Sequence, residues 1–299
     1  MISRRAFMRG VLGCGVGVFS VGGYSRLLEP RWVEINTTGI KITGLPKRFE
    51  GMTIAQVSDI HHSKYVPREF VRRCVLKVNA LSPDIIVLTG DYIYRSGEFL
   101  IPVAEELSEL QAKEGVFAVL GNHDEKDQTI QVLSKAGIRV LVNEHVTLYR
   151  KSDYLFIAGV DDLLRGRVDL RRTLNGTDEK PKLLLAHNPD VIEMAKDADV
   201  DFVMAGHTHG GQVSFPFYGP PAVPTRSGVR YAAGLFYEGN TTMYVNKGIG
   251  VSWFPVRFLV RPEITLFTLQ GVRNRRYDGS EELTSENCSG GPVSDVIHT

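Results

Sequence analysis

The chain has 299 residues, of which 43% are hydrophobic and 23% are charged, a composition typical of soluble globular proteins. Its 35 Lys and Arg residues nearly balance its 34 Asp and Glu residues, so the formal net charge is +1. This balance argues against a dedicated nucleic-acid-binding protein, and the hydrophobic content excludes a disordered or fibrous chain. Three cysteines, Cys14, Cys74 and Cys288, provide no disulfide framework.

The first residues have the pattern of an export signal. A basic stretch that contains Arg4 and Arg5 precedes the uncharged segment 10–25. This segment is shorter than the run of ~18 apolar residues that a membrane-spanning helix needs. The arginine pair resembles a twin-arginine signal, which directs export of folded proteins. We therefore predict that residues 1–25 engage the twin-arginine export machinery and that the protein lies in the periplasm or cell envelope. The sequence leaves open whether the signal is cleaved or stays as a membrane anchor.

Strand-like and helix-like patterns alternate after residue 33. Short apolar runs rich in branched residues predict strands, and longer runs with apolar residues on one face predict helices. This interleaving predicts an α/β protein with helices on the faces of its sheets, in one domain over residues 33–271. Residues 272–299 are polar and predict a mobile tail. The predicted strands cover residues 40–42, 52–57, 84–89, 116–120, 146–149, 154–160, 182–186, 202–205, 243–245 and 264–269, and the predicted helices cover 67–81, 102–112, 126–136 and 189–197.

Five of the predicted buried strands end in Asp, Asn or His. Ligands bind at the carboxyl ends of strands in α/β sheets, so these side chains are expected to meet there. Carboxylate, amide and imidazole groups bind divalent metals, and the lack of cysteine disfavours a structural zinc site. These side chains are too many to bind a single ion. They therefore predict two metal ions that share a carboxylate and together bind a phosphoryl group. In chain order, the residues are Asp59, His61, Asp91, Asn122, His123, Asp124, His187, His207 and His209.

Each of these residues also has a simpler interpretation. A single Asp after a strand is usually a helix cap or a turn residue, and a single His is more often structural than a ligand. The motifs Asp-x-His and Gly-Asp are weak alone, whereas Gly-Asn-His-Asp and Gly-His-Thr-His are more specific. All five motifs, each ending an apolar run, favour a metal site.

The motifs Asp59-x-His61, Gly90-Asp91, Gly121-Asn122-His123-Asp124, His187 and Gly206-His207-x-His209 resemble the signature of the calcineurin-like metallophosphoesterases. The resemblance extends over roughly residues 53–269 and implies a four-layer α/β/β/α sandwich of two mixed sheets flanked by helices.

The same resemblance implies a role for each motif residue. Asp59, His61 and His209 would bind one metal, and Asn122, His187 and His207 would bind the other. Asp91 would bridge the two ions, and a hydroxide between the metals would attack phosphorus. His123 would contact the phosphoryl group and protonate the leaving oxygen or stabilise its charge, with Asp124 orienting His123. The metals remain open among Mn, Fe, Zn and similar ions.

Later motifs resemble a narrower, exported bacterial branch that contains the YkuE and YaeI phosphodiesterases. They include residues 206–212, 244–250, 255–258 and 261–264. This resemblance implies hydrolysis of a phosphodiester or pyrophosphate. The branch is also similar to a UDP-diacylglucosamine pyrophosphohydrolase of lipid A synthesis, which gives the alternative of a nucleotide-lipid substrate. A third hypothesis is a non-catalytic metal- or phosphate-binding envelope protein, although no signature residue is missing.

Some residues beside the motifs have two interpretations. Tyr92, Tyr94 and Arg95 follow Asp91 and are candidates for the mouth of the site. Arg95, Arg257 and Arg261 are candidate substrate-binding residues, because arginine binds phosphate through two hydrogen bonds, but surface arginines are more often solvated. The apolar segments 215–221 and 253–260 either pack against the domain or form a lip that receives acyl chains or contacts a membrane surface.

Overall fold

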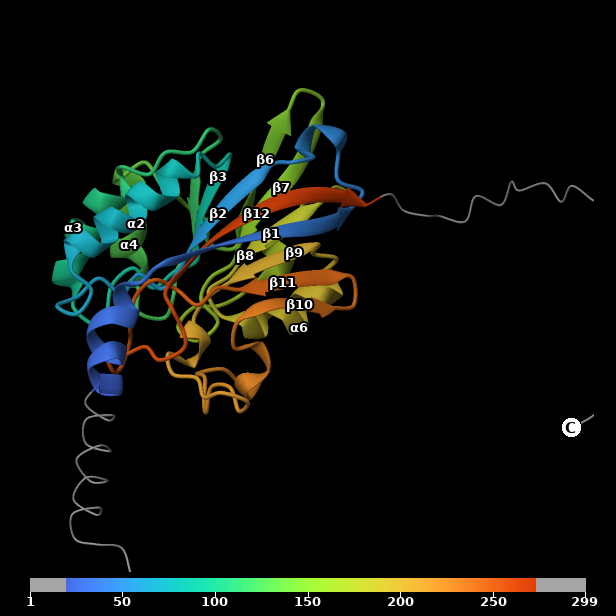
Figure 1. The fold of residues 1–299 in the computed structure, drawn as a ribbon. Coiled ribbons are helices and arrows are strands. Elements are labelled where there is room, and N and C mark those ends of the chain that lie inside the picture. The colour runs from blue at the N-terminus through green and yellow to red at the C-terminus, as the bar shows by residue number, and fades with distance from the viewer. Residues whose placement is uncertain (1–19, 273–299) are drawn as a thin grey trace, which may run out of the picture.

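The computed structural model describes residues 20–272, which form two six-stranded sheets packed face to face (Figure 1). The strand order is β1-β12-β2-β3-β4-β5 in the first sheet and β10-β11-β9-β8-β7-β6 in the second. Both sheets are mixed. The pairs β12–β2, β10–β11 and β6–β7 are antiparallel, and the others are parallel.

The elements follow one another as the sequence pattern predicts in outline. The strands of the first sheet are β1 (Glu34–Thr43), β2 (Thr53–Val57), β3 (Ile85–Leu88), β4 (Val116–Ala118), β5 (Arg139–Val140) and β12 (Glu263–Val272). Those of the second are β6 (Glu144–Arg150), β7 (Asp153–Gly159), β8 (Lys182–Leu185), β9 (Phe202–Ala205), β10 (Gly234–Glu238) and β11 (Thr241–Val245). The helices are α2 (Arg68–Ala80), α3 (Leu100–Leu107), α4 (Lys126–Lys135), α5 (Leu170–Thr173) and α6 (Ile192–Ala195).

The central strands are buried on both faces because alternate side chains enter different cores. In β3, Ile85 and Val87 face the space between the sheets, whereas Ile86 and Leu88 pack under α2, α3 and α4. In β8, Leu183 and Leu184 divide in the same way between the inner core and the helical layer that contains α6. Figure 1 shows α2–α4 and α6 on opposite sides of the paired sheets. This arrangement confirms the predicted four-layer sandwich.

Some predicted elements have different bounds. β1 is longer than the predicted 40–42, because its first half pairs in parallel with β12 although most of its side chains are polar. α3 ends at Leu107 rather than continuing to residue 112. The predicted helix 189–197 is a short 3₁₀ turn followed by α6 and another 3₁₀ turn. The short strand β5 and the edge strand β10 were not predicted from the pattern.

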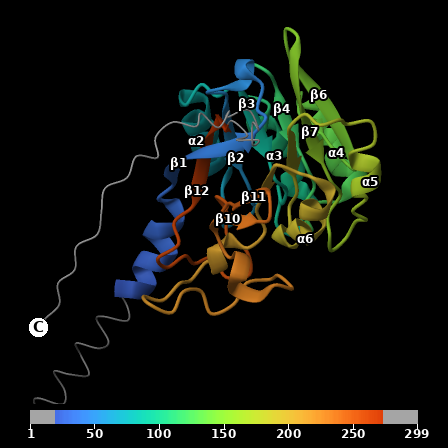
Figure 2. The same ribbon diagram turned by 90° about the vertical axis from the view of Figure 1, so that its right-hand side faces the viewer.

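The chain enters the described region as a helical segment. Residues 20–31 contain a π turn (Tyr24–Leu28) and a 3₁₀ turn (Glu29–Arg31), and they lie beside the loop that follows β11 (Figure 2). Within residues 20–272, no helix has the length and apolar content needed to cross a membrane. Residues 1–19 of the predicted export signal, residues 273–299 of the predicted tail, Cys14 and Cys288 lie outside the described residues.

Candidate metal centre

Metal-binding side chains from both sheets converge where their strands end. Two groups form, and within each group the candidate ligand atoms lie within 4.8 Å of one another. The first contains Asp59, His61 and His209, and the second contains Asp91, His187 and His207. All six side chains are buried. Each group takes a carboxylate from the first sheet and at least one imidazole from the second.

The backbone at these residues is unusual. Five of the six lie in the left-handed region, which non-glycine residues rarely adopt and which clusters at functional sites. This conformation turns the chain sharply at the strand ends and directs the side chains inward. The φ angles are 49° at Asp59, 48° at His61, 57° at Asp91, 73° at His207 and 53° at His209.

The first group leaves one carboxylate oxygen free for a cation. Asp59 Oδ2 accepts hydrogen bonds from Ser58 Oγ at 2.6 Å and from the His207 backbone N at 2.9 Å. The other oxygen, Oδ1, is buried and has no hydrogen-bond partner within residues 20–272. It lies 3.3 Å from His209 Nε2, which is 3.0 Å from His61 Nε2. A metal ion would satisfy all three atoms, so the donor set fits a divalent cation.

The second group is joined to the first through Asp91. Its Oδ1 accepts a hydrogen bond from the His123 backbone N at 2.8 Å, whereas its Oδ2 faces imidazoles. That oxygen lies 3.4 Å from His61 Nε2 and 3.3 Å from His187 Nε2, so one carboxylate oxygen faces both groups. Asn122 extends the second group, because its Oδ1 lies 3.2 Å from His187 Nε2.

Backbone carbonyls orient the imidazoles of the second group. His187 Nδ1 donates to Thr89 O at 2.8 Å, and His207 Nε2 donates to Pro224 O at 2.8 Å. The remaining nitrogens, His187 Nε2 and His207 Nδ1, lie 3.1 Å apart. Metal-binding histidines commonly donate their second ring N–H in this way, which fixes the ring and leaves the other nitrogen for the ion.

Burial and neighbouring charges shift the pKa values of the residues in the site. Although burial opposes ionisation, neighbouring His187 holds the pKa of Asp91 well below its usual range. Burial and the charge of His187 lower the pKa of His207 to about 4, and burial, then His61, lower the pKa of His209 well below its usual value. His207 and His209 are therefore neutral, as metal ligands must be, beside the ionised Asp91. His187 differs, because although burial opposes its protonation, Asp91 outweighs burial and raises its pKa to about 10, so this imidazole must lose a proton when a metal binds.

Gly206 permits the close approach of the two sheets. A Cβ atom at this position would lie 1.9 Å from Ser58 Oγ and 2.4 Å from Asp59 Oδ2. Since no side chain fits there, the strand end that carries His207 can donate its backbone N–H to Asp59.

His123 lies at the edge of the centre with its ring against those of His61 and Tyr94. The ring centroids are 5.1 Å and 5.2 Å away, respectively. Asp124 differs from the expectation. Its carboxylate accepts hydrogen bonds from the backbone N–H groups of Asp91, Tyr92 and Gly121, at 2.8, 3.0 and 2.8 Å, so it fixes the metal-ligand turns rather than the His123 ring. Burial, followed by the charge of Asp91, raises the pKa of Asp124 to about 8.

The candidate mouth residues occupy different environments. Tyr92 is buried and donates to Val119 O at 2.7 Å, so its predicted place at the mouth is wrong. Tyr94 is half-buried beside His61, and its hydroxyl accepts a hydrogen bond from the Trp253 backbone N at 3.1 Å. The sequence signal for Tyr94 was its position after Asp91. Ser58 was missed, because a serine at a strand end carries no distinctive signal.

The three candidate substrate-binding arginines also lie in different environments. Arg257 is fully buried. Its Nε, Nη1 and Nη2 atoms donate to the backbone carbonyls of Gly250, Val260 and Lys247, respectively, so the guanidinium stabilises this loop. The expectation that Arg257 binds substrate is therefore not supported. Arg261 lies over the ring of Trp32, 3.7 Å from its centroid. Arg95 is exposed and lies 5.0 Å from the ring centroid of Tyr94, near the metal centre.

Comparison with known proteins defines the family. The sequence profile described as calcineurin-like phosphoesterase matches residues 52–211, which contain all the ligand candidates. The chain belongs to this family and is a metal-dependent phosphoester hydrolase.

Individual relatives cover most of the chain. It is 37% identical to the uncharacterized metallophosphoesterase YkuE of Bacillus subtilis, over 91% of this chain and 99% of that protein. It is 32% identical to the phosphodiesterase YaeI of Escherichia coli, over 90% of this chain and 100% of that protein. It is 30% identical to the UDP-2,3-diacylglucosamine pyrophosphatase LpxG of Chlamydia muridarum, over 80% of this chain and 90% of that protein. These similarities support the predicted branch of the family.

Proposed function

We propose that the protein is a phosphodiesterase or pyrophosphatase that cleaves P–O bonds at a two-metal centre in the cell envelope. The observation that carries this proposal is the position of Asp91 Oδ2, which faces an imidazole of each ligand group at 3.3–3.4 Å. A shared carboxylate is the arrangement that holds two cations close enough to act on one phosphoryl group.

The donor set assigns the residues to two ions. Asp59, His61 and His209 would hold one, and Asn122, His187 and His207 would hold the other, with Asp91 contacting both. When bound, the ions lower the pKa of an attacking water and offset the negative charge on the phosphoryl oxygens. Mn, Fe and Zn are the candidate metals, since oxygen and imidazole donors accept each of them.

His123 is proposed to act on the substrate. Its ring lies beside His61 and the half-buried Tyr94, so it can contact a phosphoryl group held at the centre and protonate or stabilise the leaving oxygen. Asp124 positions the turns that carry Asp91 and Gly121, from which the His123 segment continues.

The test is metal analysis of the purified full chain combined with a panel of aryl phosphodiesters, aryl phosphomonoesters and nucleotide pyrophosphates. We expect about two metals per chain and a preference for diesters or pyrophosphates. Turnover of monoesters alone would contradict the proposed substrate class. A stoichiometry of one metal with full activity would contradict the shared role of Asp91.

A nucleotide lipid such as UDP-diacylglucosamine is the second candidate substrate. Similarity to LpxG and the exposed aromatic side chains of Phe215, Tyr218 and Trp253 favour it. This candidate predicts faster cleavage of the acylated substrate than of its deacylated counterpart. Equal rates for both would remove it. Since the family is enzymatic, the hypothesis of a non-catalytic binding protein has less support than either substrate.

Export by the twin-arginine machinery is part of the same proposal. It is supported by Arg4 and Arg5 before the uncharged residues 10–25. Replacing both arginines with lysine should leave the full chain in the cytoplasmic fraction. Unchanged export of this variant would contradict the assignment.

We also propose that segments 215–221 and 253–260 contact a membrane surface.

A further inference from the structure

Four chain segments meet on one side of the molecule beside the metal centre. We call residues 20–33, 60–68, 210–233 and 246–262 the rim. Hydrogen bonds join its parts: the Arg257 backbone N donates to Ser25 O at 2.9 Å, Arg26 Nη1 donates to Pro255 O at 3.2 Å, and the Phe258 backbone N donates to Gln212 O at 2.9 Å. Figures 1 and 2 show the N-terminal helical segment and the loops after β9 and β11 on the same side of the sheets.

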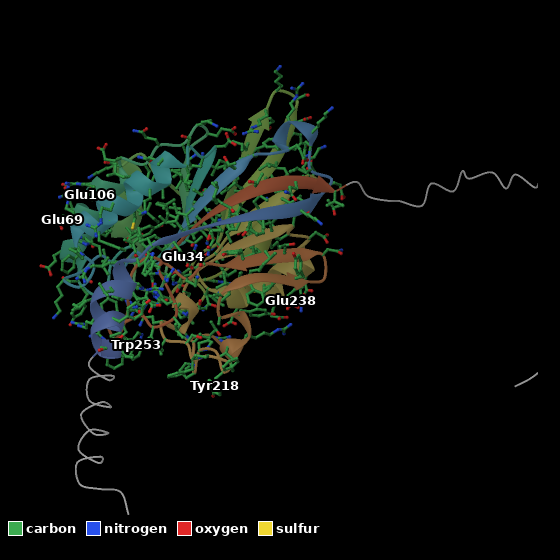
Figure 3. The ribbon with its side chains drawn as sticks, in the orientation of Figure 1. Glu34, Glu69, Glu106, Tyr218, Glu238 and Trp253 are labelled. Atoms are coloured by element: carbon green, nitrogen blue, oxygen red, sulfur yellow. The ribbon has the colours of Figure 1, made fainter. Side chains whose placement is uncertain are left out.

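The rim exposes large apolar side chains. Trp253 is 74% exposed and Phe254 is 71% exposed, although most large apolar residues within residues 20–272 are buried. Figure 3 shows Trp253 and Tyr218 at the same edge of the molecule. Groups of exposed aromatic side chains mark interaction surfaces, and aromatic residues favour the interface between water and lipid. The other strongly exposed apolar residues of the rim are Val21, Leu27, Leu28, Trp32, Phe215, Phe217, Val229 and Leu259.

The rim is also depleted of negative charge. Of the 34 Asp and Glu residues in the chain, only Glu29 belongs to it, while it contains nine Lys and Arg residues. Glu29 is buried, and its Oε1 accepts a hydrogen bond from the Val260 backbone N at 2.6 Å. Arg257 is buried, and acidic residues outside the rim pair with Arg68, Arg230 and Lys247. The positive charge that the rim presents to solvent therefore comes from the other five basic residues, Arg26, Arg31, Lys64, Arg226 and Arg261.

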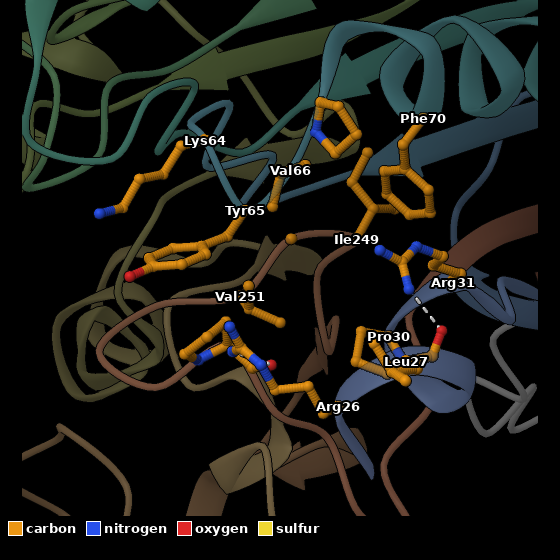
Figure 4. Close-up of a pocket in the computed structure, with 13 residues that line it drawn as sticks. Arg26, Leu27, Pro30, Arg31, Lys64, Tyr65, Val66, Phe70, Ile249 and Val251 are labelled. Carbon is orange, nitrogen blue, oxygen red and sulfur yellow. Dashed lines mark hydrogen bonds between the residues drawn. The ribbon is translucent and has the colours of Figure 1, made fainter. Parts of the chain in front are cut away.

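A basic groove lies within the rim (Figure 4). Arg26 and Arg31 from the helical segment and Lys64 from the loop after β2 line a cavity of about 180 Å³, and none of its lining residues is acidic. The Lys64 amine points away from the two arginines (Figure 4). Ile249 of the rim and Phe70 of the adjoining helix α2 line its apolar part. Positive side chains above an apolar wall match the headgroup of an anionic lipid, whose phosphate is charged and whose chains are apolar.

We propose that the rim docks onto an anionic phospholipid bilayer, with a lipid phosphate in the basic groove and Trp253 and Phe254 at the lipid interface. Charge complementarity and the adjoining aromatic side chains favour a bilayer over a soluble anion. The docked rim borders the metal centre, because the Trp253 backbone N bonds to Tyr94 and Pro224 O bonds to His207. This inference rests on the proposed function only for the choice of a membrane as partner, since docking requires no turnover.

The chain contains two tryptophans, Trp32 and Trp253, so fluorescence can report docking at one residue. In the full chain with Trp32→Phe, Trp253 is the only emitter. Vesicles of phosphatidylglycerol with brominated acyl chains should quench its emission and shift it to the blue. The matched control carries Trp32→Phe, Trp253→Phe and Tyr149→Trp, because Tyr149 is 67% exposed on the β6–β7 hairpin, away from the rim. Its emission should not be quenched.

The groove is tested in the same Trp253 protein with Arg31→Gln and Lys64→Gln. Apparent vesicle affinity should fall roughly fivefold for each removed charge near the surface, and phosphatidylcholine vesicles should bind weakly. Lys77→Gln and Lys135→Gln, which remove exposed charges from α2 and α4, serve as the control and should leave affinity unchanged. Thermal unfolding of each variant verifies the fold.

Three results would overturn the inference. Co-sedimentation with vesicles without quenching of Trp253 would mean that another part of the chain binds them. Equal affinity for neutral and anionic vesicles would remove the charge argument. A dimer in sedimentation, with Trp253 emission already blue-shifted before vesicles are added, would identify a second copy as the occupant. Hydrolysis of a soluble aryl diester without vesicles tests the proposed function separately.

Discussion

The two sheets contribute different chemistry to the metal centre. The first sheet supplies the carboxylates Asp59 and Asp91, and the second supplies His187, His207 and His209. N–H and O–H groups donate to the carboxylates, whereas the imidazoles of His187 and His207 donate to backbone carbonyls. The bond from the His207 backbone N to Asp59 and that from His187 Nδ1 to Thr89 O cross between the sheets.

This difference indicates that neither sheet forms a metal site alone. A carboxylate turn and an imidazole turn must be brought together before a cation finds a complete set of donors. Metal binding should therefore depend on the packing of the sheets, and the packing should in turn gain stability from the metal.

The largest expected effect comes from the carboxylate that joins the two ligand groups. Asp91→Asn keeps the side-chain shape but removes the charge, so turnover should fall by about a thousandfold or more, given the several kcal/mol of charge stabilisation that metals supply. Steady-state kinetics and metal analysis measure the loss. The control is Asp201→Asn, whose carboxylate bonds to the Lys182 backbone N. Retention of both metals and of activity in Asp91→Asn would remove the bridging role.

His123 comes from the first sheet but is not assigned to a metal. His123→Ala should retain both metals and lose about 10²–10⁴-fold in turnover, the range of general acid–base catalysis. If His123 protonates the leaving oxygen, the loss should grow as the leaving group becomes more basic. A series of phosphodiesters with different aryl and alkyl leaving groups measures this. An equal loss across the series would instead indicate that His123 stabilises the phosphoryl group.

Ser58 tests the bonds that orient a ligand. Ser58→Ala removes the bond to Asp59 Oδ2 and leaves that from the His207 backbone, so metal affinity should fall about 10–100-fold, as for other residues that orient metal ligands. Titration of the metal against a competing chelator measures the change. Ser63→Ala is the control, because Ser63 is buried on the same loop but its Oγ accepts from the Tyr65 backbone N. Equal affinities in both variants would contradict the role of Ser58.

Metal removal tests the contribution of the centre to stability. At a metal concentration about 100-fold above Kd, binding stabilises the folded state by about 2.7 kcal/mol per site. For a domain of this size, chelation should lower Tm by roughly 5–10 °C per site. Calorimetry with and without chelator checks this. An unchanged Tm after verified metal loss would show that sheet packing is independent of the centre.

The smallest effect lies in the helical layer of the first sheet, far from the metals. Arg72 and Arg68 hold the pKa of Glu106 below its usual range. Because the pKa of Glu106 is lower in the folded state, its ion pairs with the two arginines stabilise the folded state. This stabilisation is complete above the unfolded pKa of about 4.3 and is lost as pH falls. Glu106→Gln should therefore remove part of the stability loss between about pH 5 and pH 3, by less than about 1 kcal/mol since the arginines are exposed.

The measurement for this prediction is urea unfolding at several pH values. Glu109→Gln is the control, because Glu109 is an exposed acidic residue just after α3, the helix that carries Glu106. An identical pH dependence in wild type and Glu106→Gln would contradict the prediction.

The sequence predicted the features that depend on local pattern. The buried strands β2, β3, β8 and β9 are short apolar runs, and each ends in a ligand candidate, so both the sheets and the meeting point of the ligands were predictable. The features that depend on distant neighbours were not. β1 extends over polar residues because it pairs with β12, and Arg257 is buried because carbonyls of its own loop surround it. The carboxylate of Asp124 bonds to turns that only the folded chain brings together.

The position of β12 has a consequence for biosynthesis. This strand is nearly the last described segment, yet it lies between β1 and β2, which are among the first. During translation, β1 cannot join its sheet until residues 263–272 have emerged from the ribosome. Such long-range pairing slows folding and delays it until late in synthesis. A chain that stopped before β12 would expose an unpaired strand on each side of the gap, so premature termination is expected to produce aggregation rather than a smaller active enzyme.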